Sequence, residues 1–171
     1  MVFVHTLIDD VGSFPLPASI SRDVFDKAYV QARQAMIAGH GVRESQFLLV
    51  NFCAVVADSF RKKSATGLDV VNYPQHYDMH KQVTDEIYRA MDDGSYLVDE
   101  RRAIIPEVNV ITDEAKKLCE EFGKRVLLRV SITGPLESYL KVVGTTAHSD
   151  VLMMFAETVR RFAKNSLRFI Q

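Results

Sequence analysis

The chain alternates between short apolar runs, each bounded by Gly or Pro, and longer stretches in which apolar residues recur at helical spacing. Short, β-branched apolar runs that end at turn residues are typical of buried strands. This pattern predicts four strands, at residues 2–8, 68–71, 103–111 and 125–132. Pro106 interrupts the third run, and a proline within a strand is confined to an edge or a bulge.

Helical spacing fills the segments between these runs. A first helix is expected after Ser21, which reads as an N-cap followed by an acidic first turn, and it is expected to stop at Gly39. Further helical segments are predicted over residues 45–63, around 87–91 with an end at Gly94, over 112–122 and 136–143, and from Ser149 onward.

The alternation of strands and helices favours a parallel sheet. A complete (β/α)8 barrel needs about 250 residues, so four units in 171 residues make roughly half of one. The sequence therefore predicts an α/β fold, the first four β/α units of a TIM barrel, as one half-barrel domain over residues 1–171. A doubly wound sheet is the weaker alternative, because its Gly-rich phosphate turn is missing and Gly12 stands alone. The last helix has no exit signal before Gln171, so a truncated chain is expected.

Composition narrows the class of protein. A hydrophobic content of 47% and a formal net charge of −1 suit a soluble domain that does not bind nucleic acid. The longest apolar runs are too short to span a membrane, and Met1 begins no signal segment, so we expect a cytoplasmic location. Cys53 and Cys119 lie far apart with no C-x-x-C pattern, which indicates reduced core thiols.

Polar residues lie at the end of every predicted strand, at the edge where a barrel carries its chemistry. They are Ser13, the segment Tyr73-Pro74-Gln75-His76, Glu107 with Asn109, and Thr133 with Glu137. The alternative is that strand ends simply meet polar loops. His76 and His80 have the spacing of a zinc-binding pair, but no Glu completes an H-E-x-x-H pattern. Capping of the next helix by Asp78, with histidines at the surface, is therefore favoured.

Four segments in this order resemble the catalytic barrel of the cobalamin-independent methionine synthase family. They are Gly12-Ser13-Phe14-Pro15, Gly67-Leu68-Asp69-Val70 with Pro74 and Asp78-Met79, Arg102 with Pro106, and Thr133-Gly134-Pro135. The start at residue 1 is similar to the short archaeal type of that family. The uroporphyrinogen decarboxylase and corrinoid methyltransferase branch is a near neighbour with the same fold.

This resemblance implies a methyltransferase. In that family a zinc ion held by His and Cys binds homocysteine as a thiolate, which takes a methyl group from a methyl-folate or methyl-corrinoid donor. The resemblance implies that Val11, Gly12 and Ser13 hold the amino-acid part of homocysteine and that Arg102 helps to hold the methyl donor. It also assigns Tyr73, His76 and Thr133 to the substrate site.

Two departures from the family change the expectation for this chain. Tyr73 stands where the family has a Glu that grips the substrate amine, which favours a related enzyme for another thiol or a corrinoid as an alternative. The family's zinc ligands lie in the second half of the barrel, and neither Cys53 nor Cys119 falls at a ligand position. We therefore expect the isolated chain to bind no catalytic zinc, to carry no catalytic residue and to be inactive.

A different class of function remains open. A half barrel has open sheet edges, which associate unless they are covered. In this alternative the chain is a non-catalytic assembly or binding module that pairs with itself or with a missing C-terminal half. For the enzyme, the expected partners are a small-molecule thiol and a corrinoid protein.

Overall fold

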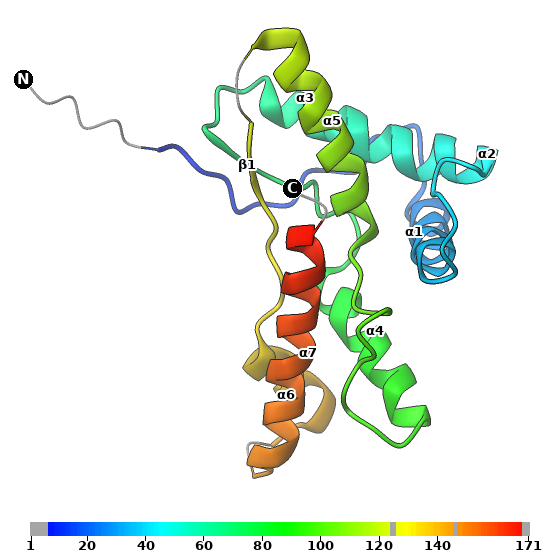
Figure 1. Ribbon diagram of the computed structural model, residues 1–171, viewed down its shortest axis with the longest axis vertical. Coiled ribbons are helices and arrows are strands. Elements are labelled where there is room, and N and C mark those ends of the chain that lie inside the picture. The colour runs from blue at the N-terminus through cyan, green and yellow to red at the C-terminus, as the bar shows by residue number, and fades with distance from the viewer. Residues whose placement is uncertain (1–6, 124–125, 146, 169–171) are drawn as a thin grey trace, which may run out of the picture.

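The computed structural model describes residues 7–123, 126–145 and 147–168. Helices dominate it, and a small parallel sheet lies among them (Figure 1). The helices are α1 (Arg22–Ile37), α2 (Gln46–Leu48), the π-helical turn η1 (Leu49–Cys53), α3 (Ala54–Ser64), α4 (Met79–Asp92), α5 (Pro106–Phe122), α6 (Pro135–Val143) and α7 (Ser149–Arg168). None of the described helices is long and apolar enough to cross a membrane.

The sheet is parallel, as predicted. Strand β1 (Val70–Asn72) pairs with β2 (Leu127–Arg129), with Val71 opposite Leu128. The segment before α1 runs beside the other edge of β1, where the Ile8 carbonyl accepts hydrogen bonds from the Asp69 and Val70 amides at 2.9 and 3.2 Å. The parallel sheet and its flanking helices confirm the α/β class. Residues 2–6 of the first predicted strand lie outside the described residues.

The prediction of a third strand is wrong. Residues 103–105 form no strand, and α5 begins at Pro106, so Glu107 lies in the first turn of a helix instead of at a strand end. Proline suits the first helical position because its fixed φ matches the helix and its missing N–H would have had no partner. Thr112, where the helix was predicted to begin, lies inside α5 and donates to the Val108 carbonyl at 2.8 Å. Within the described residues β1 therefore pairs directly with β2, and a four-stranded half barrel is not seen.

The capping residues and helical spacing predicted the helices better than the apolar runs predicted the strands. Ser21 caps α1 by accepting from the Val24 amide at 3.4 Å, and Asp78 caps α4 by accepting from the His80 and Lys81 amides at 2.8 and 3.0 Å. The helix predicted over residues 45–63 forms as α2, η1 and α3 in succession. The π-helical turn in its middle had no signal that we recognised in the sequence.

The core joins helices to the loop that follows β1. The rings of Tyr29 in α1 and Tyr77 in this loop stack with centroids 3.9 Å apart, and Phe25 meets His76 edge-on at 5.3 Å. Farther along the chain, α6 and α7 lie side by side (Figure 1), and Tyr139 packs edge-on against Phe155. Aromatic pairs of this geometry add to the stabilisation from burial.

The two thiols are free. Cys53 is buried in the core, as predicted, whereas Cys119 is only half-buried. Burial raises the pKa of the Cys53 thiol, so this side chain remains a neutral, inert part of the core.

A buried carboxylate ties α4 to its neighbours. The side chain of Glu86 is fully buried and contacts three guanidinium groups, those of Arg33 at 3.2 Å, Arg89 at 2.7 Å and Arg102 at 2.8 Å. Arg33 is itself buried and also donates to the Tyr29 hydroxyl and the Gln82 carbonyl, both at 2.8 Å. Arg33 therefore links α1 to α4 from within the core.

Replacing Arg33 is expected to destabilise the fold strongly. Arg33→Met leaves Glu86 without its buried partner, and the free energy of unfolding should fall by about 3–5 kcal/mol in urea titrations. Arg89→Met removes a partly exposed partner of the same carboxylate and should cost less than about 1 kcal/mol. Equal losses for the two variants would contradict the account.

Candidate functional site

A pocket of about 670 Å³ lies where β1 ends, between the segment before α1 and the start of α4. We call it the strand-end pocket. The carboxyl edge of a parallel sheet is where α/β proteins bind their ligands. Its lining residues are Val11, Ser13, Arg22, Asp26, Gln75, His76, Tyr77, Asp78, Met79, His80 and Lys81.

The segment before α1 is anchored to the loop after β1 and to α3. The Phe14 amide donates to the Pro74 carbonyl at 2.8 Å, and Lys63 of α3 donates to the Gly12 carbonyl at 3.0 Å. Lys63 also forms an ion pair with Asp10. Burial opposes ionisation of Asp10, but Lys63 and the Gly12 amide outweigh it and lower the pKa of this carboxyl. These contacts fix the backbone on either side of Ser13.

His76 is a structural bridge. Its side chain is 3% exposed, with Nδ1 3.1 Å from the Phe14 carbonyl oxygen and Nε2 3.0 Å from the Ser59 hydroxyl. A carbonyl oxygen only accepts, so Nδ1 carries the proton and Nε2 accepts from Ser59. Burial lowers the pKa of His76 to about 4, although the bond to Phe14 works in the opposite direction. With both nitrogens engaged, neutral His76 positions the pocket wall and has no free nitrogen for a ligand.

The loop after β1 carries an unusual backbone conformation. Gln75 has a φ of 52°, in the left-handed region that costs a residue with a side chain about 1–2 kcal/mol. Its amide oxygen accepts from Asn72 at 3.0 Å. Non-glycine residues held in this region cluster at functional sites, which agrees with the position of Gln75 in the wall of the strand-end pocket.

Tyr73 directly precedes the loop that lines the pocket but is not itself a lining residue. It is buried, and its hydroxyl lies 3.0 Å from the Ser131 carbonyl and 3.1 Å from the Gln82 side-chain oxygen. It therefore connects the end of β1 to the segment after β2 and to α4. Burial raises the pKa of the Tyr73 hydroxyl, so this group stays neutral.

The structure brings most of the residues predicted for the site into one region. Val11, Ser13 and His76 line the pocket, Gly12 lies between the first two, and Thr133 donates to the carbonyl of the lining residue Met79 at 2.9 Å. Arg102 is the exception. Its guanidinium is bound to Glu86, and it is not among the lining residues.

The charged rim of the pocket was not predicted. Arg22 donates to the His76 carbonyl and lies 3.7 Å from Asp26, one turn farther along α1. Lys81 in the first turn of α4 completes the rim. Burial raises the pKa of Asp26, against the opposing effect of Arg22. The N-cap at Ser21 is the signal that could have located Arg22, because it places Arg22 at the first position of α1.

Two cations and one carboxylate suit a zwitterion. Arg22 and Lys81 offer donors for a carboxylate, and Asp26 offers an acceptor for an ammonium group. A second carboxylate, that of Asp78, caps α4, and one of its oxygens accepts from the His80 and Lys81 amides. The chemistry of the rim therefore favours an amino-acid-like ligand.

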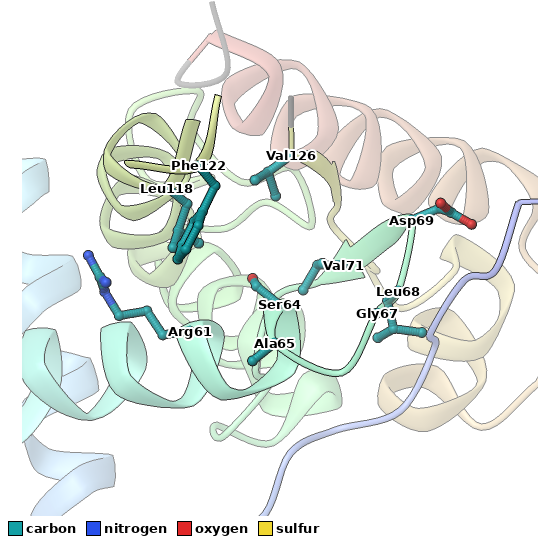
Figure 2. A pocket seen from close by; sticks show the side chains of 10 residues that line it. All are labelled: Arg61, Ser64, Ala65, Gly67, Leu68, Asp69, Val71, Leu118, Phe122 and Val126. Atoms are coloured by element: carbon teal, nitrogen blue, oxygen red, sulfur yellow. The ribbon is translucent and has the colours of Figure 1, made fainter. Parts of the chain in front are cut away.

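A second pocket, of about 660 Å³, lies at the opposite end of the strands between α3 and α5. Figure 2 shows Leu118, Phe122 and Val126 lining it together with the chain from Ser64 to Asp69. Its one cationic side chain, Arg61, pairs with Glu114 at 2.8 Å and with Glu121 at 3.4 Å. The amino ends of parallel strands contribute to stability more than to chemistry, so we do not assign the site here.

Among the described residues, no group of three or more His, Cys, Asp or Glu side chains could hold a metal ion. The chain matches no protein-family model, and comparisons with curated proteins and with solved structures find no match. The strand-end pocket is therefore the basis for the function of this chain proposed below.

The neutral state of His76 gives a testable pH dependence. Its pKa is about 4 in the folded chain and about 6.5 when unfolded, so its contribution to stability is present above pH 6.5 and is lost as the pH falls toward 4. His76→Gln should remove this part of the pH profile of unfolding. His40→Gln, at an exposed position, is the control and should retain it. A His76 ring that titrates near neutrality by NMR would contradict the assignment.

Proposed function

We propose that this chain is part of a zinc-dependent methyltransferase of the cobalamin-independent methionine synthase kind. It would help to move a methyl group from a folate or corrinoid donor to a thiol such as homocysteine, in the cytoplasm. The observation that carries the proposal is the meeting of Val11, Ser13 and His76, from two separate motifs, in a pocket whose rim suits an amino acid.

The proposal includes a barrel architecture. In it, the segment at Ile8, strand β1 and strand β2 correspond to the first, second and fourth strands of a half barrel. Their parallel order and the position of the pocket at their carboxyl ends support this correspondence. The segment 103–122 departs from it, since a helix begins where a third strand was expected.

The rim suggests a role for each charged group. Arg22 and Lys81 bind the substrate carboxylate, and Asp26 receives the ammonium group. Asp26 thereby takes the part that the family gives to a Glu at the position of Tyr73. Arg102 can contact a methyl donor only if it leaves Glu86, to which it is bound at 2.8 Å.

Zinc is assigned to a part of the enzyme outside this chain, as the resemblance implies. The described residues do not fit a zinc site. When bound, zinc would lower the pKa of the substrate thiol and so generate the nucleophile.

Binding of L-homocysteine tests the assignment of the rim. Calorimetric titration of the 171-residue chain should show binding, and Asp26→Asn should weaken it about tenfold, or about 1.4 kcal/mol, because the ammonium group loses its charged partner. Asp23→Asn changes an exposed carboxylate in the same helix and should bind as the unaltered chain does. No binding, or an Asp26 variant that binds normally, would contradict the proposal.

The isolated chain should also lack methyl-transfer activity. Without zinc the homocysteine thiol keeps its ordinary pKa and is a poor nucleophile at neutral pH. We expect no methionine above background from homocysteine with methyl-folate or methyl-corrinoid, and no stoichiometric zinc by metal analysis. Activity in the isolated chain, or one bound zinc per chain, would refute this part of the proposal.

An assembly module is the second candidate. Within the described residues the outer edge of β2 has no neighbouring strand, and Leu7, Ile8 and Val11 are exposed beside β1. Open edges of this kind template pairing with another chain. Sedimentation velocity should then show dimers that form as the chain concentration rises into the high micromolar range. A chain that stays monomeric over this range would exclude self-association.

A further inference from the structure

Glu107 is a buried acid that the proposed function does not use. It lies in the first turn of α5, its side chain is 0% exposed, and neither carboxylate oxygen has a hydrogen-bond partner among the described residues. A buried ionised carboxylate without a partner is so costly that the group takes up a proton instead. Burial accordingly raises the pKa of Glu107 to about 8.

The groups around Glu107 come from α1 and from the loop after β1. The backbone N–H groups of His76 and Tyr77 lie near its carboxylate without meeting hydrogen-bond geometry, and both favour the ionised form. Arg33 acts in the same direction from α1, but its guanidinium is already engaged by Glu86 at 3.2 Å. The attraction available to ionised Glu107 is therefore directed at the loop.

The other titratable groups that face Glu107 are fixed in neutral forms. Burial raises the pKa of Tyr29 and of Tyr73, whose charges would interact with that of Glu107. Burial likewise raises the pKa of Tyr77, and it lowers that of His76 to about 4. Near neutral pH, Glu107 is thus the group in this cluster that can gain or lose a proton.

The loop on the other side of these N–H groups forms the pocket wall. The side chains of Gln75, His76 and Tyr77 line the strand-end pocket, and the positive φ of Gln75 leaves the backbone strained at the start of the loop. A small displacement of the two N–H groups toward Glu107 therefore moves the wall of the pocket.

We propose that Glu107 is a proton-linked latch on the segment 75–78. As the neutral acid it leaves the segment in the position seen here. When its O–H bond breaks and the proton passes to bulk water, the carboxylate draws the His76 and Tyr77 N–H groups into hydrogen bonds. The shape of the strand-end pocket then depends on pH, whichever ligand the pocket binds. By linkage, a ligand that prefers one position of the segment changes the proton affinity of Glu107.

Backbone NMR of the full chain tests the latch without any ligand. The amide protons of His76 and Tyr77 should shift downfield together between about pH 6 and about pH 10, with a midpoint near 8, as they begin to donate to a carboxylate. Glu107→Gln should abolish both shifts. Glu114 is a buried acid of the same helix that pairs with Arg61 and Lys117. As the control, Glu114→Gln should leave the two amide shifts unchanged.

The assigned side-chain carboxyl carbon of Glu107 in the unaltered chain gives a second readout, which holds even if the Gln variant fails to fold. It should titrate with the same midpoint as the two amides. Any of three results would overturn the proposal. The amides do not respond to pH, the amide shifts persist in Glu107→Gln, or the carboxyl carbon reports an ionised Glu107 side chain at neutral pH.

Discussion

The bridging of two chain segments by the His76 ring is the constraint on which the site depends. One nitrogen donates to the carbonyl of Phe14, ahead of α1, and the other accepts from Ser59 in α3. The Phe14 carbonyl requires a proton on Nδ1, and burial, which lowers the pKa of His76, keeps the ring neutral so that Nε2 accepts from Ser59. The bridge fixes the loop after β1 against the segment that carries Ser13, and these two segments form part of the pocket wall.

Two buried glutamates show how one residue type serves opposite purposes. Glu86 lies among three arginines and links α1, α4 and the segment at Arg102. Glu107 has no such partner and lies behind the pocket loop. Breaking the ion pairs of a buried acid strongly destabilises the fold, whereas a buried acid without a partner binds a proton and becomes neutral. The first therefore contributes to the fold, and the second makes the loop sensitive to pH.

Local signals in the sequence predicted the helices well and the third strand poorly. Ser21 and Asp78 are caps whose bonding partners lie within three residues, so the sequence contains all that is needed to place them. The run around Pro106 is apolar enough for either a strand or a buried helix, and proline at the first helical position decides for the helix. The ion pair of Arg102 with Glu86 was not predicted, because the two residues are distant in sequence and only the tertiary fold brings them together.

The central claim is that the carboxyl end of the small parallel sheet binds an amino-acid-like thiol. The most direct measurement is the map of backbone amide shifts on addition of L-homocysteine to the labelled chain. The account predicts shifts at Val11, Ser13 and residues 75–81, and none along residues 64–69 beside the second pocket. Shifts confined to the second pocket, or none at all, would contradict it.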